Sequence, residues 1–135
     1  TGNIHTNFRG KAGMALKALE EGCDFVYIHI EAPDEAGHRG ELDTKIKAIE
    51  AIDGQVIGEL LRGLESYDDY RLMLLPDHPT PLAVRTHTAE PVPYLIYQKS
   101  KVLGSGTPYS ERSAASGVFI DPGCTLMPRF TGAAR

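Results

Sequence analysis

The sequence predicts an α/β fold, and three of its features indicate this class. Two stretches of the chain, at 8–21 and 42–64, carry apolar residues at helical spacing. Short runs of apolar and β-branched residues, at 25–30, 71–75 and 93–98, alternate with them and are typical of strands. Each of the first two runs is followed by a polar loop, as strands in open α/β sheets usually are. With 135 residues, 41% of them hydrophobic and 24% charged, the chain suits one domain spanning 1–135.

The first half of the chain predicts two helices and one strand. Apolar residues at 8, 12, 15, 16 and 19 form the stripe of a helix that Gly22 ends. FVYIHI at 25–30 predicts a buried strand, and EAPDEAGHRGE at 31–41, with one proline and two glycines, predicts a loop. The helix at 42–64 follows, and its expected apolar stripe comprises Leu42, Ile46, Ile49, Val56, Leu60 and Leu64.

The second half predicts strands more than helices. RLMLL at 71–75 is the second strand, and the proline-rich stretch at 76–93 excludes long regular structure. PYLIYQ at 93–98 is the third strand, and Ser110 is the expected N-cap of a short helix. The tail is open to two interpretations, a strand at 118–120 and a helical turn at 125–130. The resulting architecture is a three-layer sandwich, a mostly buried sheet with flanking helices.

Composition narrows the class of partner. A formal net charge of −4, with Lys and Arg scattered singly, argues against a nucleic-acid-binding surface. No apolar run approaches the roughly 20 residues of a membrane helix, so no membrane partner is expected. Cys23 and Cys124 lie far apart without a metal-binding or disulfide-rich spacing, which favours reduced thiols and a cytoplasmic location.

Five residues in the two post-strand loops have the chemistry of metal ligands. Asp34 and His38 stand four apart in the first loop, while Asp77, His78 and His87 lie in the second. If the two strands are neighbours, both loops meet at one edge of the sheet. Imidazole and carboxylate together suit Zn²⁺ and Mn²⁺. Side chains at successive extended positions diverge, so Asp77 and His78 are not expected to chelate one ion easily; each could face a different ion, or the pair could bridge two sites.

Simpler interpretations remain open for each motif alone. Asp34 could be a solvated residue of a turn, and PDHPTP at 76–81 could be a turn fixed by two prolines. His29, inside the apolar run, is expected to be a packed, hydrogen-bonded core residue, and His5 a surface or turn residue.

At these motifs the sequence resembles the archaeal-type, cofactor-independent (2,3-bisphosphoglycerate-independent) phosphoglycerate mutases of the alkaline phosphatase superfamily. The resemblance is carried by PDEAGH, PDHPTP and RTHTAEPVP, together with TGNIHTNFRGKA and KIKAIEAIDGQVIGELL, in the order of the family. It extends from Thr1 to about Met127.

The resemblance implies an isomerase of glycolysis and gluconeogenesis that uses two divalent metal ions and a phosphoserine intermediate. Asp34, His38 and His87 would hold one ion, and Asp77 and His78 the other. The ions would be Mn²⁺ or Zn²⁺, with Mg²⁺ or Co²⁺ as alternatives, and the substrate a phosphoglycerate. Arg85 is the expected contact for a substrate anion, because guanidinium binds phosphate and carboxylate with two parallel hydrogen bonds. Lys11 is a weaker candidate.

The family pattern also places its nucleophilic serine and one further Asp ligand before the first matching stretch. No serine of this chain lies in a comparable loop; those considered are Ser66, Ser100, Ser105 and Ser110, in turns or at a helix start. We therefore expect the chain to be the C-terminal portion of such an enzyme and inactive alone. Apolar surface that the remainder would cover leads us to expect a homo-oligomer.

Two rival functions use the same residues differently. Another phosphatase or phosphotransferase of the alkaline phosphatase superfamily would have the same ligands. A metal-free interaction protein would retain them without a catalytic role.

Overall fold

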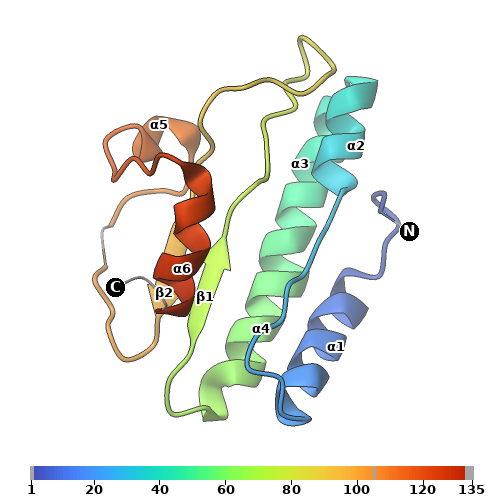
Figure 1. The fold of residues 1–135 in the computed structure, drawn as a ribbon. Coiled ribbons are helices and arrows are strands. Elements are labelled where there is room, and N and C mark those ends of the chain that lie inside the picture. The colour runs from blue at the N-terminus through green and yellow to red at the C-terminus, as the bar shows by residue number, and fades with distance from the viewer. Residues whose placement is uncertain (1, 105, 133–135) are drawn as a thin grey trace. The chain divides into compact units, whose positions relative to one another are not determined.

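The computed structural model describes residues 2–104 and 106–132, which divide into two compact units. The first unit contains the chain up to Tyr67 together with Pro79–Ala89. The second contains Asp68–His78 and the chain from Glu90 onward. Helices dominate the first unit, while the second combines a pair of strands with short helices, so the α/β class is confirmed (Figure 1).

Helix α1, Phe8–Glu20, confirms the first predicted helix. The side chain of Asn7 caps it by accepting a 2.8 Å hydrogen bond from the amide of Gly10. Phe8, Ala12 and Ala15 form its buried stripe, and α1 packs against the later helices η1 and α4. Gly22, at φ +100°, turns the chain away after the helix ends.

The loop predicted at 31–41 is wrong, because Ala32–Arg39 forms helix α2. Pro33 lies in the first turn of the helix, where backbone N–H groups have no partner within the helix, so the missing N–H of proline costs no hydrogen bond. The fixed φ of proline also suits a helix. Gly40 then ends the helix in the left-handed conformation, at φ +70°. The proline and the final glycine that suggested a loop are thus the start and stop signals of a short helix.

The long predicted helix at 42–64 is confirmed, with an irregular centre. It consists of α3, Leu42–Ala51, the π-helix η1, Ile52–Ile57, α4, Gly58–Gly63, and the 3₁₀ turn η2, Leu64–Ser66. Val56, Leu60 and Leu64 are buried as expected. The other half of the stripe is wrong: Leu42, Ile46 and Ile49 are 46–56% exposed. The wider hydrogen-bonding step of the π-helix changes which face of the helix points inward, and Ala48 is the buried residue of α3.

Residues 25–30 were expected to form a buried strand, and this prediction is wrong. The segment returns from the end of α1 to α2 without strand pairing (Figure 1). Burial alternates along it, with Val26, Ile28 and Ile30 half-buried and the residues between them exposed. This period of two is typical of extended chain. The sequence pattern was therefore interpreted correctly as extended, but a strand also requires a hydrogen-bonded neighbour.

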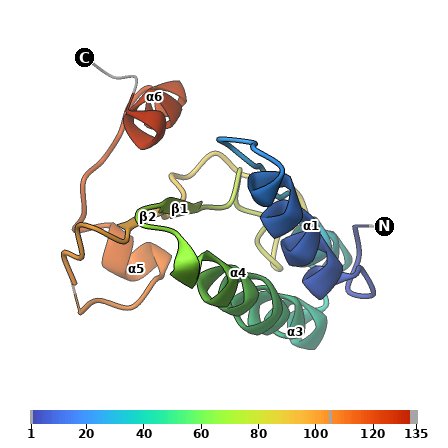
Figure 2. The same cartoon turned by 90° about the horizontal axis from the view of Figure 1, so that it is seen from below.

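The second unit contains strands β1, Arg71–Leu74, and β2, Leu95–Gln98, which pair antiparallel with Arg71 opposite Gln98 (Figures 1 and 2). Both predicted strands are confirmed, although their residues are half-buried or exposed rather than fully buried. Ser110 caps α5, Glu111–Ala114, as expected. The tail forms a 3₁₀ turn η3, Gly123–Thr125, and helix α6, Leu126–Thr131, while residues 118–120 form no strand.

Asp69 joins the chain before β1 to the chain after β2. Its carboxylate accepts hydrogen bonds from the Gln98 side-chain amide and from the Ser100 amide and hydroxyl, at 2.8–2.9 Å. These donors, the Gln98 amide first, lower the pKa of Asp69 to about 2. Ser100 thus has a structural role, as does Ser110, while Ser66 lies in η2 and Ser105 lies outside the described residues.

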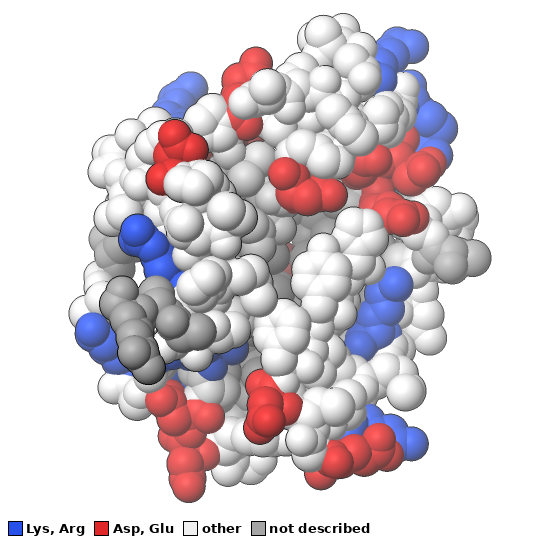
Figure 3. All heavy atoms as spheres, in the orientation of Figure 1, with Lys and Arg blue, Asp and Glu red and all other residues white. Residues whose placement is uncertain are grey.

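The surface carries charges of both signs. On the face shown in Figure 3 acidic and basic side chains are interspersed, and the basic ones do not merge into one patch. Within the described part of the chain, every helix is too short or too polar to span a membrane. Cys23 and Cys124 are both free and exposed.

Candidate metal centre

Helix α2 places Asp34 and His38 one turn apart on the same face. Residues four apart in a helix are neighbours, and the Nε2 atom of His38 lies 3.4 Å from Oδ2 of Asp34. Pro33 and Gly40, which suggested a loop in the sequence, delimit this helix, so both side chains project from helical backbone.

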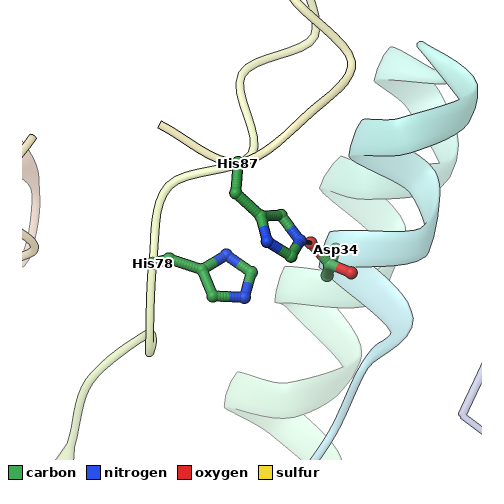
Figure 4. A group of neighbouring side chains, drawn as sticks. All are labelled: Asp34, His78 and His87. Carbon is green, nitrogen blue, oxygen red and sulfur yellow. Dashed lines mark ion pairs between the residues drawn. The ribbon is translucent and has the colours of Figure 1, made fainter. Parts of the chain in front are cut away.

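His87 joins this pair from the loop formed by residues 79–89. Its Nε2 atom lies 3.4 Å from Oδ1 of Asp34 and 3.0 Å from Nε2 of His38. Figure 4 shows the His87 ring pointing from its loop toward the Asp34 carboxylate on α2. Three residues with potential ligand atoms therefore converge within the first unit, although the two histidines are 49 residues apart in sequence.

The second nitrogen of His38 has a partner that fixes the ring. Its Nδ1 atom lies 3.0 Å from the carbonyl oxygen of Arg85, an acceptor, so Nδ1 carries the proton and donates it. With Nδ1 as the donor, Nε2 is the nitrogen that can supply a lone pair to a metal ion, and it faces Asp34 and His87. Arg85 turns its carbonyl inward in a left-handed conformation, at φ +56°, and its guanidinium lies against Gly40.

The separations between the two imidazole nitrogens and the Asp34 carboxylate are near those of ligands around a divalent ion. Ligand atoms bound to a tetrahedral zinc ion at about 2.0–2.1 Å lie about 3.3 Å from one another. The two Nε2 atoms lie 3.0 Å apart, His38 Nε2 lies 3.4 Å from Oδ2 of Asp34, and His87 Nε2 lies 3.4 Å from Oδ1 of the same carboxylate. Two imidazoles and a carboxylate are also the donor set preferred by Zn²⁺ and Mn²⁺. Asp34, His38 and His87 therefore have the residue types and the approximate spacing that a divalent ion requires.

Asp77 and His78 lie in the second unit, where His78 is its last residue before Pro79. Oδ1 of Asp77 accepts a 3.2 Å hydrogen bond from the backbone amide of His78, and its Oδ2 lies 3.4 Å from Nε2 of the same histidine. The expected divergence of these side chains is wrong, because the chain bends here instead of running extended. His78, also drawn in Figure 4, is one peptide bond from the loop that carries His87.

Two residues beside the triad of Asp34, His38 and His87 were not predicted from the sequence. The hydroxyl of Thr80 donates to Oδ1 of Asp34, and Nζ of Lys45 donates to the carbonyl oxygen of Thr80 at 2.7 Å. Thr80 stands two residues after His78 in PDHPTP, which marked the motif without indicating the role of its threonine. The expectation that His29 is a core residue is wrong: its side chain is 48% exposed, and its Nδ1 lies 3.3 Å from the Tyr27 hydroxyl.

Known protein families and individual proteins match nearly the whole chain. Residues 2–131 match the family model described as Metalloenzyme superfamily. A probable 2,3-bisphosphoglycerate-independent phosphoglycerate mutase of Geobacter sulfurreducens is 47% identical over 94% of this chain and 32% of its own length. A 2,3-bisphosphoglycerate-independent phosphoglycerate mutase of Methanothrix thermoacetophila is 48% identical over 87% of this chain and 30% of its own length.

The fold has a close structural counterpart. The solved structure of the PH0037 protein from Pyrococcus horikoshii superimposes with a TM-score of 0.84 at 29% sequence identity, covering 98% of this chain and 39% of that one. The architecture is accordingly a fragment of an alkaline-phosphatase-like domain, as expected from the sequence. The chain spans about a third of the length of the curated relatives that it matches.

Proposed function

The chain belongs to the metalloenzyme superfamily, and from this premise we propose that it supplies metal ligands to a 2,3-bisphosphoglycerate-independent phosphoglycerate mutase. One observation carries the proposal: Nε2 of His38, Nε2 of His87 and the Asp34 carboxylate converge at ligand spacing in the first unit. The names of the relatives favour a mutase over other phosphotransferases with similar ligands.

In this proposal Asp34, His38 and His87 hold one divalent ion, while Asp77 and His78 serve a second. The ions are Mn²⁺ or Zn²⁺, with Mg²⁺ or Co²⁺ as alternatives. Two bound ions would stabilise the negative charge on a phosphoryl group during its transfer. The reaction interconverts 3-phosphoglycerate and 2-phosphoglycerate in glycolysis, through a phosphoserine, in the cytoplasm.

Metal titration tests the ligand assignment. We expect Zn²⁺ to bind the 135-residue chain in isothermal calorimetry, and His38→Ala to weaken binding at least tenfold, because it removes one of three ligands. His5→Ala is the matched control, since His5 is exposed and outside the triad. Equal affinities of wild type and His38→Ala would contradict the assignment.

An assay with 3-phosphoglycerate accompanies the titration. We expect no turnover by the chain alone, because the resemblance places the nucleophilic serine elsewhere.

Arg85 is proposed to contact an anionic group of the substrate. Its backbone supports His38, while its exposed guanidinium has no carboxylate within 4.0 Å among the described residues. By contrast, the neighbouring Arg39 is paired with both Glu35 and Glu41. With Zn²⁺ present, Arg85→Ala should weaken binding of 3-phosphoglycerate about tenfold and leave the Zn²⁺ affinity unchanged, because the substitution keeps the carbonyl that orients His38. An unchanged affinity for 3-phosphoglycerate would exclude this role.

A second copy of the chain is the proposed partner for the apolar face of α3. Leu42, Ile46 and Ile49 follow one another at helical spacing and are all about half exposed. We expect the sedimentation coefficient to rise with protein concentration, and Ile46→Glu to abolish that rise. A monomer that is independent of concentration would argue against self-association.

A further inference from the structure

Thr80 is a buried polar residue beside the metal triad. Only 5% of it is exposed, and its hydroxyl donates a hydrogen bond to Oδ1 of Asp34. A threonine hydroxyl placed among buried groups is costly unless it finds an acceptor. Here the acceptor is a carboxylate oxygen, so the hydrogen bond is charge-assisted and directional.

The backbone of Thr80 is held as firmly as its side chain. Nζ of Lys45, from α3, donates to the Thr80 carbonyl oxygen at 2.7 Å. On the other side α2 approaches so closely at Gly37 that an added Cβ would lie 2.6 Å from the same oxygen. Thr80 is thereby fixed against both helices of the first unit that flank the site.

We propose that Thr80, anchored by Lys45, is a positioning residue that limits Asp34 to one metal-bound oxygen. Each carboxylate oxygen lies 3.4 Å from a different histidine nitrogen, so a freely rotating carboxylate could present both oxygens to one ion. The Thr80 hydrogen bond engages Oδ1 and fixes the carboxylate plane. The consequence is a lower coordination number, which leaves room at the ion for a ligand from outside the triad. This inference rests on the proposed metal-binding function.

A purely structural role for Thr80 predicts a different outcome. If the hydroxyl only docked the 79–89 loop on α2, its removal would lower stability and weaken metal binding without changing the coordination of the bound ion. A spectroscopic signature therefore separates the two roles. The visible absorption of bound Co²⁺ weakens as its coordination number rises, so it reports whether Asp34 binds through one oxygen or two.

The experiment compares Zn²⁺ affinity and the Co²⁺ spectrum of the full chain and its variants. We expect Thr80→Val, which keeps the shape but removes the hydroxyl, to lower Zn²⁺ affinity by about 10–100-fold and weaken the Co²⁺ absorption. Thr80→Ser should retain both wild-type values. Thr125→Val is the matched control, because it removes a hydroxyl that donates to the Pro122 carbonyl in the second unit. It should change neither value.

Each outcome decides the inference. A wild-type spectrum in saturated, folded Thr80→Val overturns the positioning role while the metal site stands. A chain that binds no Zn²⁺ overturns the proposed metal function and this inference together. If Thr80→Val does not fold, Lys45→Met replaces it: this variant keeps the hydroxyl but frees the Thr80 backbone, and should weaken the Co²⁺ absorption in the same direction. An unchanged spectrum in Lys45→Met would then overturn the proposal.

Discussion

Gly37→Ala should damage both the stability of the first unit and its affinity for metal. A Cβ at this position would lie 2.6 Å from the Thr80 carbonyl oxygen and 3.0 Å from Nζ of Lys45. The oxygen is backbone and cannot move without the 79–89 loop, which also carries His87. We expect a loss of about 1–3 kcal/mol in the free energy of unfolding, as for other overpacked sites. The Zn²⁺ affinity should fall more than tenfold, because Asp34 and His87 are pushed apart.

Gly13→Ala provides the matched control for this substitution. Gly13 is also a helical glycine, but a Cβ there would meet nothing within 4 Å. Replacing it should stabilise the chain by about 0.5–1 kcal/mol, since alanine is the better helix former, and leave Zn²⁺ binding unchanged. Urea unfolding and calorimetry measure the two quantities. Equal changes in Gly37→Ala and Gly13→Ala would show that α2 and the loop are not in close contact.

The sequence was sufficient for elements whose signals are local. Helix α1 has its own cap at Asn7 and its own buried stripe, and Ser110 caps the N-terminus of α5 in the same way. The segment at 25–30 shows the limit of such signals. Its alternation of burial is that of extended chain, but strand formation depends on a partner that no local pattern specifies.

The same distinction applies to the metal centre. The family resemblance grouped Asp34, His38 and His87, and the structure does bring these three side chains together. Residue types and spacing alone predicted that the two loops converge only if two strands are neighbours, and residues 25–30 form no strand. The prediction of a loop at α2 was wrong because Pro33 and Gly40 mark the two ends of a helix, and Gly37 lies inside it. The contribution of Thr80 was not predictable, since it depends on a side chain 46 residues away in sequence.

Phe8→Ala is expected to have the largest effect on stability, while leaving the metal site intact. Phe8 is 5% exposed and begins the buried stripe of α1, which packs mainly against η1 and α4. Truncating a buried phenylalanine costs about 3–5 kcal/mol, a large share of the 5–15 kcal/mol that stabilises a typical domain. Urea unfolding should therefore show a much lower midpoint.

Met14→Ala is the control on the same helix, because Met14 is 64% exposed and its truncation should change the free energy of unfolding by less than about 0.5 kcal/mol. Similar midpoints for the two variants would show that Phe8 is not part of the core. At a temperature where Phe8→Ala is still folded, its Zn²⁺ affinity should equal that of the wild type, since α1 packs mainly against η1 and α4, which carry none of the proposed ligands. We expect Phe8→Ala to lose stability but keep its metal affinity, and Gly37→Ala to lose both. This contrast would establish that the metal centre depends on the contact of α2 with the 79–89 loop and not on the core as a whole.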